Sequence, residues 1–120
     1  MSRYVVLLSC LLGASPAFAG TVVCTGTVDY LQYDSNDKFA IKLSTMNQAV
    51  YFCTPQGTWT VTAGYSTGSE TCKMMYASFL AAKLAGIPVG AVYFDGDGVP
   101  ATCDAWAAWQ SASIRHFVVE

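Results

Sequence analysis

Five consecutive residues, Gly64-Tyr65-Ser66-Thr67-Gly68, match the G-x-S-x-G pattern that surrounds the nucleophilic serine of α/β-hydrolases. Aspartates and the single histidine, His116, follow in the order that a catalytic triad of that class requires. That serine, however, needs a parallel sheet with crossover helices, and this sequence has room for one long helix. Small polar residues are also common in any loop that enters a helix. We therefore expect no enzyme, and a serine hydrolase that uses Ser66 remains the less favoured alternative.

Cysteines are the second group that could do chemistry. Four follow the first 19 residues: Cys24, Cys53, Cys72 and Cys103. Their spacings of 29, 19 and 31 residues fit no zinc motif. An even number in a short chain indicates two disulfides where the chain is exported, and three connectivities are then open. Two disulfides leave no thiol for His116 to activate, so a cysteine nucleophile is not expected.

Two acidic segments, Asp34-Ser35-Asn36-Asp37 and Asp95-Gly96-Asp97-Gly98, offer oxygen ligands at alternate positions, as calcium loops do. Neither is followed by the bidentate glutamate of an EF-hand. Both are typical of tight turns between strands. We expect turns here, and no metal or other cofactor.

The first 19 residues have the features of a secretory signal peptide. An arginine near the start precedes an apolar run from Tyr4 to Leu12, and Ala17-Phe18-Ala19 forms an A-x-A cleavage site. The run is shorter than the roughly 20 residues that span a bilayer. We expect cleavage after Ala19, a single domain over residues 20–120, and a periplasmic or secreted protein without a membrane span in the mature chain.

Charge argues against nucleic acid as a partner. Residues 20–120 contain five Lys or Arg and eight Asp or Glu residues, a net charge of about −3, without a basic cluster. Binding to phosphates requires a positive surface.

The order of predicted elements is three strands, a helix and two strands. The strands are expected at residues 21–33 with a bend at Gly26, and at 38–43, 49–53, 89–94 and 113–119. A short extra strand and a glycine-bearing loop are expected within residues 58–68, and a helical turn at 103–110. Short connections require antiparallel pairing of the first three strands. This order predicts a β-rich α+β fold, an OB-fold-like five-stranded antiparallel barrel with the helix between its third and fourth strands.

The helix is expected from Ser69 until Gly86 stops it as a left-handed cap, with Pro88 just beyond. Thr67 and Glu70 have the spacing of a capping box. Met75, Tyr76, Phe79 and Ala82 form the stripe that should face the core. On another face Ala77, Ala81 and Ala85 recur every fourth residue, which allows close packing between copies of the chain. Alanine is also simply a strong helix former, so this assembly face has a plain structural alternative.

Exposed aromatic rings are the remaining candidates for binding, because an aromatic face covers the C–H side of a sugar ring. Trp106 and Trp109 are three residues apart and would share one face of the helical turn. Burial of at least one tryptophan in so small a core is the competing expectation.

Several short pieces between residues 25 and 94 resemble the B subunits of the subtilase cytotoxin and typhoid toxin group. They are Thr25-Gly26-Thr27-Val28, Tyr51-Phe52-Cys53, a cysteine before the helix, Ala77-Ser78-Phe79, and Gly86-Ile87-Pro88-Val89 leading to Tyr93. Those subunits are OB-fold pentamers that bind sialylated glycans. The chain also resembles small exported bacterial proteins without an assigned role.

The resemblance implies a site and a disulfide pattern. In that family a serine of the first strand and a tyrosine of the fourth hold the sugar, and Thr25 and Tyr93 fall at those positions. It also implies the pairs Cys53–Cys72 and Cys24–Cys103. We therefore expect an exported, toxin-B-subunit-like module that binds a cell-surface glycan through Thr25, Tyr93, Trp106 and Trp109, as a homo-oligomer or with a secreted catalytic subunit. The alternative is a disulfide-stapled protein-interaction module.

Overall fold

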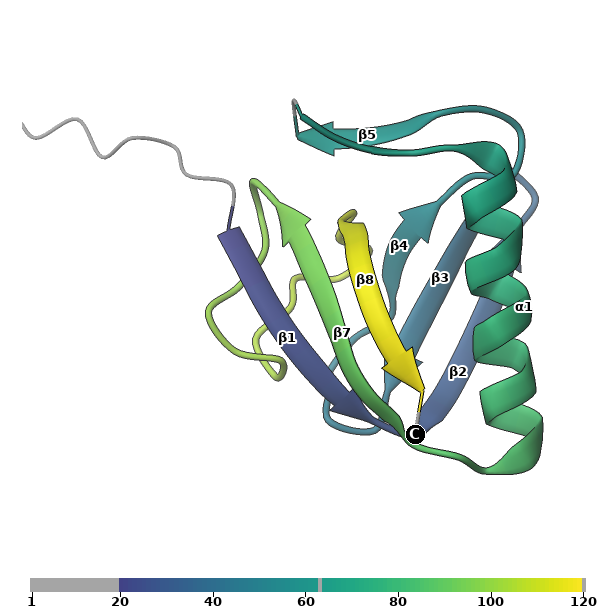
Figure 1. Ribbon diagram of the computed structural model, residues 1–120. Coiled ribbons are helices and arrows are strands. Elements are labelled where there is room, and N and C mark those ends of the chain that lie inside the picture. The colour runs from purple at the N-terminus through teal and green to yellow at the C-terminus, as the bar shows by residue number, and fades with distance from the viewer. Residues whose placement is uncertain (1–19, 63, 120) are drawn as a thin grey trace, which may run out of the picture.

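The computed structural model describes residues 20–62 and 64–119, so the predicted signal peptide lies outside the described residues. Within these residues the fold consists of three antiparallel sheets and one helix (Figure 1). The first sheet has the order β1-β7-β8, with β1 at Gly20–Gly26, β7 at Val89–Gly96 and β8 at Ser113–Val119. The second has the order β2-β3-β4, with β2 at Val28–Asp34, β3 at Lys38–Leu43 and β4 at Val50–Cys53. The third is a hairpin of β5, Trp59–Thr62, and β6, Tyr65–Thr67.

The predicted long first strand is present as β1 and β2, and the bend between them lies at Gly26. Its φ of 124° is a conformation that side-chain-bearing residues rarely adopt, and a Cβ there would lie 2.2 Å from Ser44 Oγ. The bend carries the chain from the first sheet into the second, so β1 pairs with β7 whereas β2 pairs with β3. Gly26 therefore joins the two larger sheets.

The predicted β-rich α+β fold is confirmed, but the strands form open sheets and do not close into a barrel. A single parallel bridge joins Tyr51 of β4 to Ser111, which lies just before β8. Its two hydrogen bonds run from Tyr51 N to Gln110 O and from Ala112 N to Tyr51 O, each 2.9 Å. The β5–β6 hairpin was predicted only as one short strand and a loop, and it lies over the ends of β7 and β8 (Figure 1).

Helix α1, Ser69–Ala85, comes between β6 and β7 and packs beside β2 (Figure 1). Its buried residues are Cys72, Met75, Phe79 and Ala82, and Tyr76 stacks on Phe39, which confirms the predicted core stripe. Gly86 ends the helix at φ 66°, as predicted. The capping box is wrong: Gly68 is the N-cap and no side chain caps the helix.

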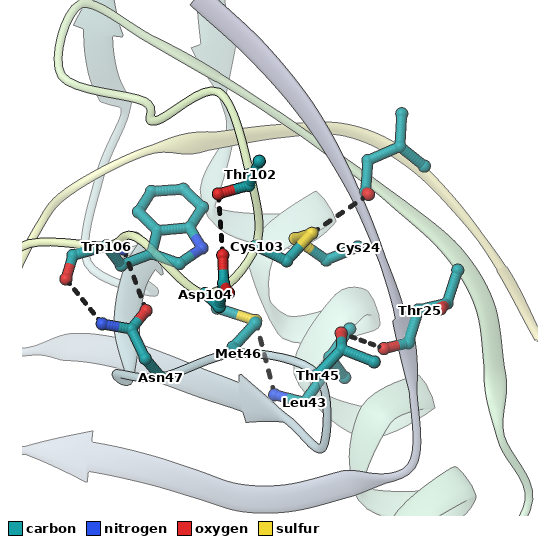
Figure 2. The surroundings of a disulfide bond; sticks show 11 residues. Cys24, Thr25, Leu43, Thr45, Met46, Asn47, Thr102, Cys103, Asp104 and Trp106 are labelled. Atoms are coloured by element: carbon teal, nitrogen blue, oxygen red, sulfur yellow. Dashed lines mark hydrogen bonds between the residues drawn. A yellow bond between two sulfur atoms is a disulfide. The ribbon is translucent and has the colours of Figure 1, made fainter.

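Two disulfides fix elements that are distant in sequence. Cys53–Cys72 ties the end of β4 to the first turn of α1, and Cys24–Cys103 ties β1 to the long β7–β8 connection, residues 97–112 (Figure 2). These are the pairs that the resemblance implies. Cys72 is a disulfide anchor, and its thiol is not free to react.

Candidate functional site

Trp109, in the β7–β8 connection, is the most exposed aromatic residue among those described, and it lies beside a surface hollow. Its side chain is 60 % exposed and its ring stacks on Tyr51 at a centroid distance of 5.8 Å. Its φ is 57°, a left-handed conformation that is uncommon for a bulky residue and costs of order 1–3 kcal/mol. Such strain persists only where the surrounding structure imposes it.

Three sets of bonds hold this connection in place. Cys103 is bonded to Cys24, and Figure 2 shows Asn47 beside the backbone of Trp106. The Asn47 amide donates to Trp106 O and accepts from Trp106 N, both at 2.9 Å. The bridge to Tyr51 fixes the residues that follow Trp109. Trp109 is thus an exposed ring on a well-anchored loop, which is how a rigid binding platform is built.

A hollow of about 240 Å³ lies beside Trp109. Its walls combine the aromatic rings of Tyr30 and Trp109 with the hydrogen-bonding side chains of Lys42, Asn47 and Gln48, and Ala49 completes the lining. Lys42 also lies 3.5 Å from Asp29, an exposed ion pair. We call the outward surface formed by this hollow and by Gln32, Asp34, Lys38 and Tyr51 the aromatic face.

A row of hydrogen bonds crosses the aromatic face. The Tyr30 hydroxyl donates to Gln32, the Gln32 amide donates to Asp34 Oδ1, and the Tyr51 hydroxyl donates to Asp34 Oδ2. The bond from Tyr51, followed by that from Gln32, lowers the pKa of Asp34. The same bond raises the pKa of Tyr51, because the neutral phenol is the form that donates. The Lys38 Nζ lies 5.3 Å from the centroid of the Tyr51 ring, and this cation–π contact helps to hold the ring in position.

The aromatic face places aromatic rings, amides and a cation side by side. A flat ligand with one apolar side and several hydroxyl groups would satisfy both the ring and the polar groups.

Trp106 and Trp109 have different environments, so the predicted shared face is wrong. Residues 103–110 form turns instead of a helix. Trp106 is buried and packs edge-on against Phe94 at a ring-centroid distance of 5.2 Å. Its Nε1 has no hydrogen-bond partner among the described residues. The Asn47 bonds hold the Trp106 backbone, and of the two tryptophans only Trp109 lines the hollow.

Thr25 and Tyr93 lie on the other sheet, away from the aromatic face. Val23 pairs with Tyr93, and Thr25 is two residues further along β1, so Thr25 and Tyr93 share the outer face of the β1-β7-β8 sheet. Thr25 is exposed, and its carbonyl accepts a hydrogen bond from Thr45 Oγ1 at 2.6 Å (Figure 2). Tyr93 is half-buried and its ring contacts His116 at 3.9 Å. The structure therefore brings these two predicted residues near each other, but not near Trp109.

Ser66 and His116 are not assembled into a triad. The Ser66 hydroxyl lies 3.0 Å from Thr60 Oγ1, and the cavity beside Ser66 contains Asp95 and Arg115 but not His116. Within residues 20–62 and 64–119, no three His, Cys, Asp or Glu side chains gather in a metal-binding group.

The three alanines of the predicted assembly face, Ala77, Ala81 and Ala85, are all exposed on α1. Met74 and Leu84 extend this surface and are 69 % and 79 % exposed. Among the described residues, no helix is both long and apolar enough to cross a membrane.

The chain matches no protein-family model, no curated protein and no solved structure. The site therefore rests on geometry. Sequence reasoning identified Trp109 but missed Tyr30, Lys42 and Gln48. The only sequence signal for the aromatic face was that Tyr30 and Gln32 are two residues apart in the predicted first strand, so their side chains point to the same side of it.

Proposed function

We propose that this protein is an exported glycan-binding module, similar to a toxin B subunit, with no catalysis of its own. The observation that carries the proposal is the exposed ring of Trp109 beside a hollow lined by hydrogen-bonding groups. The backbone of Trp109 is in a left-handed conformation, and its loop is anchored by a disulfide and hydrogen bonds. Stacking on the ring would select the apolar side of a sugar, and Lys42 and Gln48 would bind its hydroxyl or carboxylate groups.

The strand pairing supports an OB-like arrangement. If β1 and β2 are counted as one bent strand, it pairs with both β3 and β7, and β7 pairs with β8. A parallel bridge joins β4 to Ser111, just before β8. In OB-folds, sugars bind over the second and third strands and beside the loop between the fourth and fifth. Lys42, Tyr51 and Trp109 occupy the corresponding places on β3, on β4 and in the β7–β8 connection.

A glycan array probed with the disulfide-bonded protein after export tests the proposal. We expect selective binding, weakened at least about tenfold by Trp109→Ala, because a tryptophan at the centre of a contact commonly contributes more than 1.4 kcal/mol. Tyr65→Ala is the matched control, since Tyr65 is also an exposed aromatic residue but lies on the β5–β6 hairpin.

Thr25→Ala and Tyr93→Phe test the site that the resemblance implies. Binding that is lost in these variants but kept in Trp109→Ala would move the glycan to the β1-β7-β8 sheet. An array without any bound sugar would refute the proposed function.

A protein-interaction module is the second candidate, and the exposed apolar surface of α1 favours it. Met74, Ala77, Ala81 and Leu84 lie along one side of the helix without a partner among the described residues. The mass in solution tests whether this face joins copies of the chain. A monomer whose mass is unchanged in Leu84→Glu would exclude self-assembly through it, including assembly with the toxin-like geometry.

A further inference from the structure

Both lysines of the aromatic face lie beside an aspartate. Lys42, which lines the hollow, has its Nζ 3.5 Å from Asp29 Oδ2. Lys38 is the register partner of Asp34 in the β2–β3 pair. The pKa of Asp34 is lowered by its hydrogen bonds and also by the charge of Lys38, so this carboxylate stays ionised at neutral pH. The charges of these four side chains therefore cancel.

This balance leaves no spare cation for a negatively charged sugar. Carboxylates are bound most strongly by the two parallel N–H groups of an arginine. Among the described residues the single arginine is Arg115, which lies on β8 and is paired with a carboxylate of its own sheet. A carboxylate or sulfate on a bound sugar would have to compete with Asp29 for Lys42.

The other polar groups of the hollow suit hydroxyl groups. Asn47 uses one N–H and one lone pair of its amide on the Trp106 backbone, which leaves further donor and acceptor capacity. The Gln48 amide also donates and accepts. The Tyr30 hydroxyl donates to Gln32, and its oxygen can accept. A sugar hydroxyl both donates and accepts, whereas an ionised carboxylate only accepts and would leave these acceptors without a donor.

We propose that the aromatic face recognises a neutral pyranose and discriminates against sugars that carry a carboxylate or sulfate. The sugar ring stacks on Trp109, and its hydroxyl groups exchange hydrogen bonds with the amides and the tyrosine hydroxyl of the hollow. Asp29 is the specificity-determining residue, because it occupies Lys42 and repels a second anion. The hollow of about 240 Å³ is smaller than the roughly 300–1,000 Å³ of sites for drug-sized ligands, which suits a single sugar ring. This inference rests on the proposed glycan binding and adds the class of sugar.

A glycan array with matched ends tests the preference. It presents neutral hexose and N-acetylhexosamine ends beside the same ends oxidised to the uronate at C6 or sulfated, and it is probed with the disulfide-bonded protein. We expect the neutral ends to bind at least about fivefold more tightly, since an acidic group leaves acceptors of the hollow unsatisfied. Acidic ends that bind as tightly as neutral ones would overturn this inference and leave glycan binding intact. An array without any bound sugar would refute the proposed function, and this inference with it.

Asp29→Asn tests the residue assigned to the discrimination. The change removes a negative charge and releases Lys42, so it should raise the affinity for a uronate relative to its neutral counterpart by about two- to fivefold at low ionic strength. Glu70→Gln is the matched control, because Glu70 is also an exposed carboxylate in an ion pair, 3.2 Å from Lys73, but lies on α1. It should leave the ratio of the two affinities unchanged. Equal ratios in the two variants would overturn the proposal.

Discussion

The two disulfides close loops of very different length, which allows a quantitative test of how they stabilise the protein. Cys24 and Cys103 are 79 residues apart, whereas Cys53 and Cys72 are 19 apart. In the chain-entropy model the longer loop stabilises the folded state by about 4.5 kcal/mol and the shorter one by about 3.3 kcal/mol. The expected difference is therefore about 1.2 kcal/mol in favour of Cys24–Cys103.

Simple replacement of each pair by alanine would hide this difference. Cys53 and Cys72 are both fully buried, whereas Cys103 is partly exposed. Removing one additional buried sulfur costs on the order of 1 kcal/mol in lost burial and cavity formation. The alanine variant of the Cys53–Cys72 pair therefore carries an extra penalty. This penalty nearly cancels the difference of about 1.2 kcal/mol that is expected from loop length.

Two variants avoid the cancellation, each with one pair changed to alanine and the other pair retained. For each variant the free energy of unfolding is measured by urea titration with the remaining disulfide oxidised and then reduced. A fixed concentration of trimethylamine N-oxide keeps the reduced forms folded. Because the sulfur atoms remain in both states, the difference reports mainly the loop: about 4.5 kcal/mol for Cys24–Cys103 and about 3.3 kcal/mol for Cys53–Cys72.

Equal differences, or a larger one for Cys53–Cys72, would refute the reasoning from loop length. Residual structure in the denatured chain would then be the dominant contribution. An m-value that rises on reduction would support a denatured state that expands when the cross-link is released.

Three further predictions concern single positions. Gly26→Ala should lower the free energy of unfolding by about 1–3 kcal/mol, because the position has a positive φ and an added Cβ would clash with Ser44. Gly57→Ala is the control, since a Cβ there meets open space and should leave stability nearly unchanged. Equal urea midpoints for the two variants would contradict this prediction. The folded state lowers the pKa of Asp34, so the Asp34 carboxylate stabilises the protein above about pH 4 and this contribution is lost as the pH falls further. Tyr51→Phe removes the main hydrogen bond to Asp34 and should reduce this acid dependence, as measured by urea unfolding at several pH values. Since the pKa of Tyr51 is raised, its contribution is complete below about pH 10 and lost at higher pH, which ultraviolet titration of the phenols can follow; an unshifted titration would contradict the bond to Asp34.

Local patterns were enough to predict most of the elements. In the strand at Lys38–Leu43, large apolar residues alternate with lysine and alanine. The helix over Ser69–Ala85 ends at a glycine with Pro88 beyond it, so both elements follow from neighbours in the chain. The bend at Gly26 was also predictable, because a glycine inside a strand pattern indicates a break. The β6 strand was missed because three residues beside glycines carry little strand signal.

The candidate site was predicted only in part. Trp109 was identified as a binding residue, but its separation from Trp106 depends on Asn47, whose amide fixes the Trp106 backbone from 59 residues away. Tyr51 and Lys42 reach the same face only because β3 and β4 pair. Such contacts leave no periodic trace in the sequence.

The sequence by itself determined where strands and helix form and which helix face is apolar, because propensity and periodicity act between near neighbours. Only the tertiary structure decided that the sheets stay open, that Trp109 faces solvent while Trp106 is buried, and that Asp95 and Arg115 meet at the uncapped end of α1. Each of these depends on pairing between residues far apart in the chain, and one sequence does not record that pairing.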